Sequence, residues 1–299
     1  MDRAFIFLPW WESLWPEILK DSHQKIDVKF DLFPNGEKRV HIQPWKWQSA
    51  NEIVVIGSLR DSQNKDQNLY YLLFLWDALK RAWVQWFTLI SPFLPYTRQD
   101  RITRLWEPIA SSVVFKLLKS AWVKKLITFN LHNSCEEWLF DGQIIHINLL
   151  PQLVKSIVDK IDVIVAPDVG RAKDINKLAT QFNKQQAVIL KQRDSDGKIN
   201  VTKLIGDVKN KNVAIVDDMI DTWGTMIKAL EILKAHDAKN IYIVAVHWLF
   251  SPPAPSRFKK ARDKNLYNQL LISDTILVKE RITWMKIEKV VFKNLREVI

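Results

Sequence analysis

The sequence predicts an α/β protein made of two tandem domains, each a mainly parallel β-sheet flanked by helices. Short apolar runs typical of buried strands alternate with amphipathic runs typical of helices, which implies parallel sheets covered on both faces. The pattern runs through twice, with a join around residues 141–150, and 299 residues with 47% hydrophobic content can form two cores. We therefore expect one domain over residues 1–146 and a second over residues 147–299.

The expected strands are short runs rich in Ile, Val, Leu and Phe. In chain order they are Ile53–Gly57, Trp86–Ile90, Leu126–Asn130, Val163–Ala166, Ala187–Leu190, Val213–Val216 and Ile241–Val246. The expected helices lie between them, where apolar residues recur every three or four positions. They are Leu69–Ala82, Pro108–Ala121, Lys173–Phe182 and Met226–His236.

The net charge of +11 comes from scattered lysines, with short clusters at Lys124-Lys125 and Lys259-Lys260. A nucleic-acid-binding protein would gather this excess on one face or helix, so we expect attraction for polyanionic substrates and no nucleic-acid partner. The single cysteine, Cys135, excludes an intramolecular disulfide and is typical of a reducing compartment.

The longest apolar runs are too short for a secretion signal or a membrane span. Ala4–Leu8 is shorter than the apolar stretch of a secretory signal. Leu69–Trp76 is followed at once by Asp77 and Lys80, well short of the roughly 20 residues that cross a bilayer. We expect a cytoplasmic protein without a membrane partner.

The strongest chemical signal is Val213–Met226, which reads VAIVDDMIDTWGTM. Asp217 and Asp218 follow a buried strand and only accept hydrogen bonds, so they suit the two hydroxyls of a ribose. A helix N-terminus favours a phosphate, and three residues there offer hydroxyl or backbone N–H groups. These three are Thr222, Gly224 and Thr225.

Two aspartates after a strand are also typical of magnesium ligands in nucleotide hydrolases and of receiver-type phosphorylation sites. The full D-D-x-x-D-T-x-G-T spacing is far more specific than the two aspartates alone. The chain has no G-x-x-x-x-G-K-[ST] loop to support the hydrolase alternative.

Two stretches of the first half carry groups suited to a nucleotide. Phe33-Pro34-Asn35-Gly36-Glu37 is a turn, and most such turns only connect elements, but its Phe, Asn and Glu could stack on and hydrogen-bond an adenine. Arg98-Gln99-Asp100 follows an expected strand, and the planar guanidinium of an arginine donates to phosphate in pairs. Surface arginines are usually only solvated, but the end of a parallel strand is a favourable position.

Further candidates follow other strands. His132 comes just after Leu126–Asn130, although a lone histidine is more often structural than a ligand. Asp168 follows Val163–Ala166 and could bind magnesium or substrate. The polar stretch 191–206 carries Lys191 and Arg193, and we interpret it as a loop that could act as a mobile lid over a transferring phosphate.

Tryptophan outnumbers glycine by 14 to 7, whereas glycine alone averages ~7% of residues in proteins. Several tryptophans lie where a turn or helix end calls for glycine. The suspect positions are Trp10, Trp11, Trp83, Trp106, Trp122, Trp138, Trp223 and Trp248. We hypothesise that these are UGA codons that the organism reads as glycine. The alternative is a lineage that is rich in tryptophan, and Trp86, inside an expected strand, is consistent with a natural tryptophan.

Together these motifs resemble the ribose-phosphate pyrophosphokinase family over nearly the whole chain, and the family has a type I phosphoribosyltransferase-like fold in both domains. F-P-N-G-E at 33–37 is similar to its adenine loop, R-Q-D-R at 98–101 to its ATP motif, and N-L-H-N at 130–133 stands where D-L-H is usual. P-D-V-G at 167–170, K-Q-R at 191–193 and H-W-L-F-S at 247–251 resemble further motifs. Two departures are Asn130 in place of an aspartate and Arg171 where a second glycine is common.

The resemblance implies transfer of the diphosphoryl group of ATP to the anomeric hydroxyl of ribose 5-phosphate, which gives 5-phosphoribosyl 1-pyrophosphate and AMP for nucleotide biosynthesis. The implied ATP-binding residues are Phe33, Asn35, Glu37, Arg98, Gln99 and Asp100. The implied ribose 5-phosphate-binding residues are Asp217, Asp218, Asp221, Thr222, Gly224 and Thr225. The implied catalytic residues are Lys191, Arg193 and His132, and the implied Mg²⁺ ligands are His132 and Asp168. A homo-oligomer built on dimers is also implied, of which a hexamer is one form.

Three alternatives remain from the sequence. A phosphoribosyltransferase that consumes the same metabolite would share residues 217–225 but would not need the motifs at 33–37 and 98–101. A non-catalytic, synthetase-like regulatory subunit usually lacks the lid cations or the histidine, and both are present here. A basic nucleic-acid-binding protein would show duplex affinity that falls steeply with salt.

Overall fold

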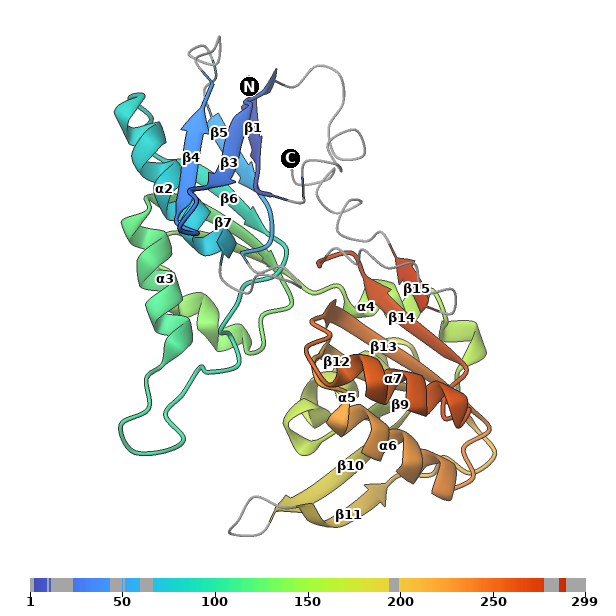
Figure 1. The fold of residues 1–299 in the computed structure, drawn as a ribbon. Helices are drawn as coiled ribbons and strands as arrows, with labels where there is room; N and C mark the ends of the chain where they lie inside the picture. Colours follow the sequence, from blue (N-terminus) through green and yellow to red (C-terminus); the bar gives the residue numbers. More distant parts are fainter. Residues whose placement is uncertain are drawn as a thin grey trace. The chain divides into compact units, whose positions relative to one another are not determined.

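The computed structural model describes residues 3–9, 11, 24–43, 50, 52–59, 67–193, 199–276 and 285–288, without the side chains of 67, 191–193, 199–202 and 285–288 (Figure 1). The chain divides into two compact units, one formed mainly by Met1–Asn148 and the other mainly by Leu149–Asp274. Each contains a mainly parallel sheet flanked by helices, so the predicted fold class is confirmed.

The first unit contains a six-stranded parallel sheet in the order β2-β1-β5-β6-β7-β8. Its strands are β1 (Arg3–Phe7), β2 (Gln24–Lys25), β5 (Glu52–Ile56), β6 (Phe87–Ser91), β7 (Val123–Phe129) and β8 (Gln143–Ile147). The helices are α2 (Gln67–Arg81), α3 (Ala110–Ser120) and the 3₁₀ helix η3 (Ser134–Leu139). A separate antiparallel hairpin pairs β3 (Val28–Leu32) with β4 (Lys38–Ile42).

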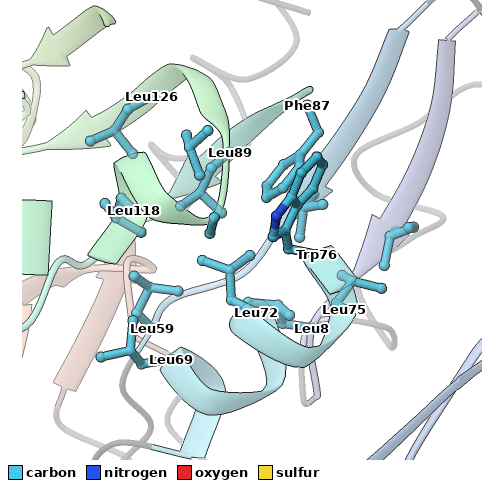
Figure 2. Close-up of a cluster of buried hydrophobic side chains, with 14 of the residues drawn as sticks. Leu8, Leu59, Leu69, Leu72, Leu75, Trp76, Phe87, Leu89, Leu118 and Leu126 are labelled. Atoms are coloured by element: carbon cyan, nitrogen blue, oxygen red, sulfur yellow. The ribbon is translucent and has the colours of Figure 1, made fainter. Parts of the chain in front are cut away.

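The core of the first unit forms where the apolar faces of α2 and α3 meet the sheet. Leucines at 69, 72 and 75 and Trp76 lie on one face of α2, as the helical spacing of apolar residues requires. They pack against Leu8, Phe87 and Leu89 of the sheet region and Leu118 of α3 (Figure 2). This packing anchors the strands whose carboxyl ends carry the candidate site residues of this unit.

The second unit contains a seven-stranded sheet in the order β11-β10-β9-β12-β13-β14-β15, in which only β10 and β11 pair antiparallel. Its strands are β9 (Val163–Ala166), β10 (Gln185–Arg193), β11 (Ile199–Ile205), β12 (Asn212–Ile220), β13 (Asn240–Trp248), β14 (Gln269–Ser273) and β15 (Met285–Glu288). Its helices are α4 (Leu150–Lys155), η4 (Val158–Lys160), η5 (Val169–Arg171), α5 (Ala172–Gln181), α6 (Gly224–Ala235) and α7 (Ala254–Asp263).

The strand order places a topological switch point between β9 and β12. From β9 the chain moves through α5 to β10 on one side, and it returns to form β12 on the other side of β9. In open α/β sheets, ligands bind outside the carboxyl ends of the strands at such a point. A ligand site is therefore expected at the residues that follow β9 and at those that end β12.

All seven expected strands and all four expected helices are present, with bounds shifted by a few residues. β12 was expected to end at Val216, but it continues to Ile220, so Asp217 and Asp218 belong to the strand itself. The loop expected over 191–206 is wrong in large part, because β10 extends to Arg193 and pairs with β11 at one edge of the sheet. The β-branched residues Ile199, Val201 and Thr202 favour this extended backbone. In the described part of the chain, no helix is long and apolar enough to cross a membrane.

Candidate active site

The acidic end of β12 and the start of α6 form one continuous stretch, as the sequence predicts. Asp218 is buried, and its backbone N–H donates to the Asp217 side chain at 2.9 Å. A turn of three residues, 221–223, then leads to Gly224, the first residue of α6. The carboxylates and the helix N-terminus are therefore consecutive along the chain.

Arg171, the last residue of the short helix η5 that follows β9, contacts the end of β12. Its guanidinium forms an ion pair with Asp218, and its Nε lies 3.6 Å from a carboxylate oxygen of Asp217. Its backbone N–H donates to Asp168 at 3.3 Å, which caps the short helix η5. Gly170 leaves room for this cap, since a Cβ there would lie 3.2 Å from the Asp168 carboxylate. One residue thus links three carboxylates that come from two strand ends.

The charges in this cluster shift one another's pKa values. Burial, together with the charge and hydrogen bond of Asp218, raises the pKa of Asp217 well above its usual value, while Arg171 acts in the opposite direction. Burial alone would lower the pKa of Arg171, but the charges of Asp218 and Asp217 outweigh it and raise that pKa. Vicinal buried carboxylates resist double ionisation, and Arg171 is the cation that offsets this resistance.

The N-terminus of α6 lies at the other end of the acidic stretch. Gly224 and Thr225 occupy its first turn, where backbone N–H groups have no partner within the helix. Arg257 of α7 lies beside this turn, since its Nη1 donates to the Thr222 carbonyl at 3.0 Å and would lie 3.1 Å from a Cβ at Gly224. A cation and a helix N-terminus together suit an anionic group.

The segment with Lys191 and Arg193 belongs to β10, which forms with β11 an antiparallel two-stranded arm at one edge of the sheet of the second unit. Lys191 pairs with Thr202 and Arg193 with Ile199 across the β10–β11 ladder, with an irregularity between Gln192 and Arg193. The side chains of Lys191 and Arg193 lie outside the described part of the structure, so their predicted role stays a prediction.

The candidate adenine loop forms the tip of the β3–β4 hairpin. The backbone N–H of Phe33 donates to the Glu37 carbonyl at 2.7 Å, and the Asn35 side chain accepts the Glu37 N–H at 3.2 Å. The Phe33 ring is 44% exposed, and the Arg39 guanidinium lies 5.2 Å from its centroid. Arg39 is held by two hydrogen bonds to Asp31 and, with Lys29, keeps the pKa of that carboxyl well below its usual value. The tip therefore presents an exposed aromatic ring on an ordered turn.

The R-Q-D-R and N-L-H-N motifs contact each other within the first unit. The Asn133 side chain donates to the Asp100 carboxylate at 2.9 Å. The backbone N–H of Leu131, next to His132, donates to Nε2 of His146 at 3.0 Å. His146 Nδ1 lies 2.7 Å from the Glu137 carboxylate, so the ring carries its proton on Nδ1. His146 thereby holds the loop that carries His132.

The two predicted magnesium ligands lie in different units, His132 in the first and Asp168 in the second. Among the residues that the structure describes, no group of three or more His, Cys, Asp or Glu side chains forms a metal site. Mg²⁺ commonly binds through one or two carboxylates, several waters and the phosphates of a substrate, so Asp168 by itself is a chemically suitable ligand.

Sequence reasoning missed several residues that contact the candidate residues within each unit. These are Glu137, His146, Arg171 as a partner of the aspartates, and Arg257. His146 lies on β8, a strand that the sequence analysis took as a join between domains. Arg171 was noted only as a departure from a glycine, and that departure was the available signal.

Comparisons with known proteins agree on one family. Residues 13–121 match the model of the N-terminal domain of ribose phosphate pyrophosphokinase, and residues 142–280 match that of the phosphoribosyl transferase domain. The ribose-phosphate pyrophosphokinase of Streptomyces coelicolor is 34% identical over 95% of this chain and 90% of its own length. That of Pyrococcus abyssi is 34% identical over 84% and 85%, respectively.

A solved structure extends the likeness to the fold. The crystal structure of phosphoribosylpyrophosphate synthetase from Mycobacterium smegmatis covers 100% of this chain and 99% of its own, with a TM-score of 0.87 and 28% identity. With the site geometry described above, these matches identify the chain as a member of the ribose-phosphate pyrophosphokinase family.

Proposed function

We propose that this protein transfers the diphosphoryl group of ATP to the anomeric hydroxyl of ribose 5-phosphate and releases 5-phosphoribosyl 1-pyrophosphate and AMP. The observation that carries this proposal is the cluster at the switch point of the second unit, where Asp217 and Asp218 adjoin the N-terminus of α6. Carboxylates that only accept hydrogen bonds suit the ribose hydroxyls, and a helix N-terminus suits the 5-phosphate.

Ribose 5-phosphate would bind along this stretch in one orientation. Its hydroxyls donate to Asp217 and Asp218, and its phosphate accepts hydrogen bonds from the turn and the first residues of α6. The phosphate-binding residues are Asp221, Thr222, Gly224 and Thr225. This orientation presents the anomeric hydroxyl to a nucleotide.

ATP would bind to the motifs of the N-terminal domain, which we propose as residues 1–146. Ribose 5-phosphate would bind to the C-terminal domain, which we propose as residues 147–299. The exposed ring of Phe33 stacks on the adenine while Asn35 and Glu37 hydrogen-bond its edge. Arg98, Gln99 and Asp100 hold the phosphates, and Asn133 orients Asp100. Stacking and charge pairing then fix both ends of the nucleotide.

The transfer itself depends on position and charge. The anomeric hydroxyl attacks the β-phosphorus in line and releases its proton to water, the bond from that phosphorus to the α-phosphate oxygen breaks, and AMP leaves. Lys191 and Arg193 offset the charge on the transferring group, and His132 is the third residue that we propose as catalytic. Mg²⁺, with His132 and Asp168 as ligands, would neutralise and orient the triphosphate.

The proposal extends to the setting of the enzyme. We expect a homo-oligomer built on dimers that acts in the cytoplasm, where the exposed single Cys135 would stay reduced. Light scattering on the purified protein would give its mass.

The test is an assay of labelled ATP with Mg²⁺ in the presence and absence of ribose 5-phosphate. Ribose-dependent AMP, with label from the γ-phosphate recovered in the sugar product, is expected. ADP as the product would indicate simple phosphoryl transfer, and no product from a folded protein would indicate a non-catalytic subunit. The protein with glycine at the suspect tryptophans is assayed beside the protein with the tryptophans. The variant Asp218→Ala, which lacks a proposed ribose-binding carboxylate, is the negative control.

A further inference from the structure

We propose that Arg171 is a positioning residue for ribose 5-phosphate, which holds the Asp217 and Asp218 carboxylates in place as one acceptor site. The proposal rests on the function proposed above. Its first support is geometric, because the guanidinium bridges both carboxylates while its own backbone N–H is fixed by Asp168.

Arg171 is itself buried enough to be part of the site and not a surface charge. Its side chain is 14% exposed and that of Asp218 is 3% exposed. Ion pairs at such positions are only weakly screened by solvent or salt. A planar guanidinium can donate to two carboxylates at once, and a lysine ammonium in the same place could not reproduce that geometry.

The charge balance around the pair explains why a cation is needed. Asp168, the N-cap of η5, and Asp174 of α5 face Arg171, and Asp221 lies just after β12, the strand that carries the pair. His247 lies on the neighbouring strand β13, opposite Met219. Among the described residues that contact the pair, Arg171 is the cation, so it favours the charged form of the acceptors and holds them in place for the sugar. Arginine at position 171 is thus a feature of this chain, because the resembling motif commonly has a glycine there.

The experiment compares Arg171→Met and Arg171→Lys with the parent protein, and uses Arg81→Met as the matched control. Arg81 forms an ion pair with Asp77 on α2 of the first unit, whereas the cluster belongs to the second unit. For Arg171→Met we expect the KM for ribose 5-phosphate to rise at least about tenfold, while the KM for ATP stays within about twofold. The acid limb of kcat/KM for ribose 5-phosphate should move up by about one pH unit, because the lost cation leaves the carboxylates easier to protonate.

Calorimetric titration with ribose 5-phosphate provides a measurement that needs no turnover. Weaker binding by Arg171→Met, with partial recovery in Arg171→Lys, supports the proposal. Unchanged binding and an unchanged pH limb overturn it, and so does tighter binding, which would mean that Arg171 competes with the sugar. If Arg171→Met does not fold, Arg171→Lys decides, since its single ammonium should still weaken ribose binding and spare ATP. A parent that binds the sugar but releases no AMP refutes the proposed function and leaves this binding test intact.

From an independent observation we infer that the natural residue at four tryptophan positions is glycine. Trp83, Trp106, Trp122 and Trp223 have φ angles of 68°, 70°, 55° and 66°. This left-handed region suits glycine and is a genuine outlier for a bulky side chain.

Three other helix ends show what these positions require. The residues just after α5, α6 and α7 with positive φ are Asn183, Asp237 and Asn265, the types that tolerate this conformation after glycine. Trp83 and Trp122 occupy the corresponding positions after α2 and α3. Their backbone N–H groups donate to the backbone carbonyls of Lys80 and Lys119. Trp83 is 92% exposed, so its ring gains little from packing.

Trp223 carries a further sign of misfit. It lies in the phosphate-binding turn at the N-cap of α6, and its buried indole N–H has no hydrogen-bond partner among the described residues. Buried indole groups usually find one. By contrast Trp76, in the middle of α2 and buried in the core, is a tryptophan that the fold uses.

Stability and coding sequence test this second inference. Trp83→Gly and Trp106→Gly should each raise the Tm by about 2–4 °C through relief of the left-handed backbone, and Trp122→Gly should raise it by less, because Trp122 also stacks on Trp76. Trp138 is the matched control, because it is 88% exposed but has no positive φ, and Trp138→Gly should not raise the Tm. Unchanged or lower Tm values at the first three positions, or UGG codons there in the coding DNA, would overturn the inference.

Discussion

Asn133 donates a hydrogen bond from its side chain to the Asp100 carboxylate across 33 positions of sequence, at 2.9 Å. The same asparagine accepts the backbone N–H of Cys135 and so caps η3. Asp100 is thereby fixed relative to the loop that carries His132. Two motifs that the sequence presents separately form a single structure in the first unit.

This contact predicts that Asn133→Ala weakens the response to ATP. Hydrogen bonds to charged groups are worth about 1.5–3 kcal/mol, so the KM for ATP should rise roughly tenfold or more while that for ribose 5-phosphate changes little. Steady-state kinetics with each substrate varied in turn would measure both. Asn240→Ala is the control, since the Asn240 side chain also donates a hydrogen bond, to Asn212. Asn240 begins β13, so it lies at the amino end of its strand and not at the carboxyl end, where ligands bind. Equal effects of the two substitutions on ATP would contradict the assignment.

The raised pKa of Asp217 predicts an acid limb in ribose 5-phosphate binding that lies above the ordinary range of an aspartate. A carboxyl whose folded-state pKa is raised becomes protonated as the pH falls through that pKa, and it then loses its charge and part of its acceptor capacity. Asp218→Asn removes the neighbouring charge, so the limb should move to lower pH although affinity falls. A profile of kcat/KM against pH for both proteins would show it. A limb at the same pH in both proteins would mean that another group titrates there.

The sequence predicted the acidic stretch because strand, aspartates and helix start are contiguous, and local patterns reveal such sites. It could not predict that Arg171 contacts Asp218, because that contact depends on the parallel register that pairs Val163 of β9 with Val213 of β12. The strand β8 was missed because its run is short and contains Gln143 and His146. α7 was missed because its first turn contains a proline and because basic residues outnumber the few apolar residues that would show a helical spacing.

Lys191 predicts a different kinetic signature from the ribose-binding residues. Lys191→Ala should lower kcat by orders of magnitude with little change in ribose 5-phosphate affinity, because the cation acts mainly on charge that develops in the transition state. Lys203→Ala is the control, since Lys203 is an exposed lysine on β11 of the same arm. Single-turnover rates beside calorimetric binding would separate the two quantities. Unchanged turnover in Lys191→Ala would refute its role.

Phe33 predicts an effect confined to the nucleotide. Stacking of a base on an aromatic ring is worth about 1–3 kcal/mol, so Phe33→Ala should raise the KM for ATP roughly 10- to 100-fold and leave that for ribose 5-phosphate nearly unchanged. Phe74→Ala provides a matched control, because Phe74 on α2 is equally exposed, at 44%. ATP analogues that lack the purine should bind the parent and Phe33→Ala alike, since the lost contact is with the base. If Phe33→Ala also weakens such analogues, the ring acts by holding the hairpin and Arg39 in place, and the adenine lies elsewhere.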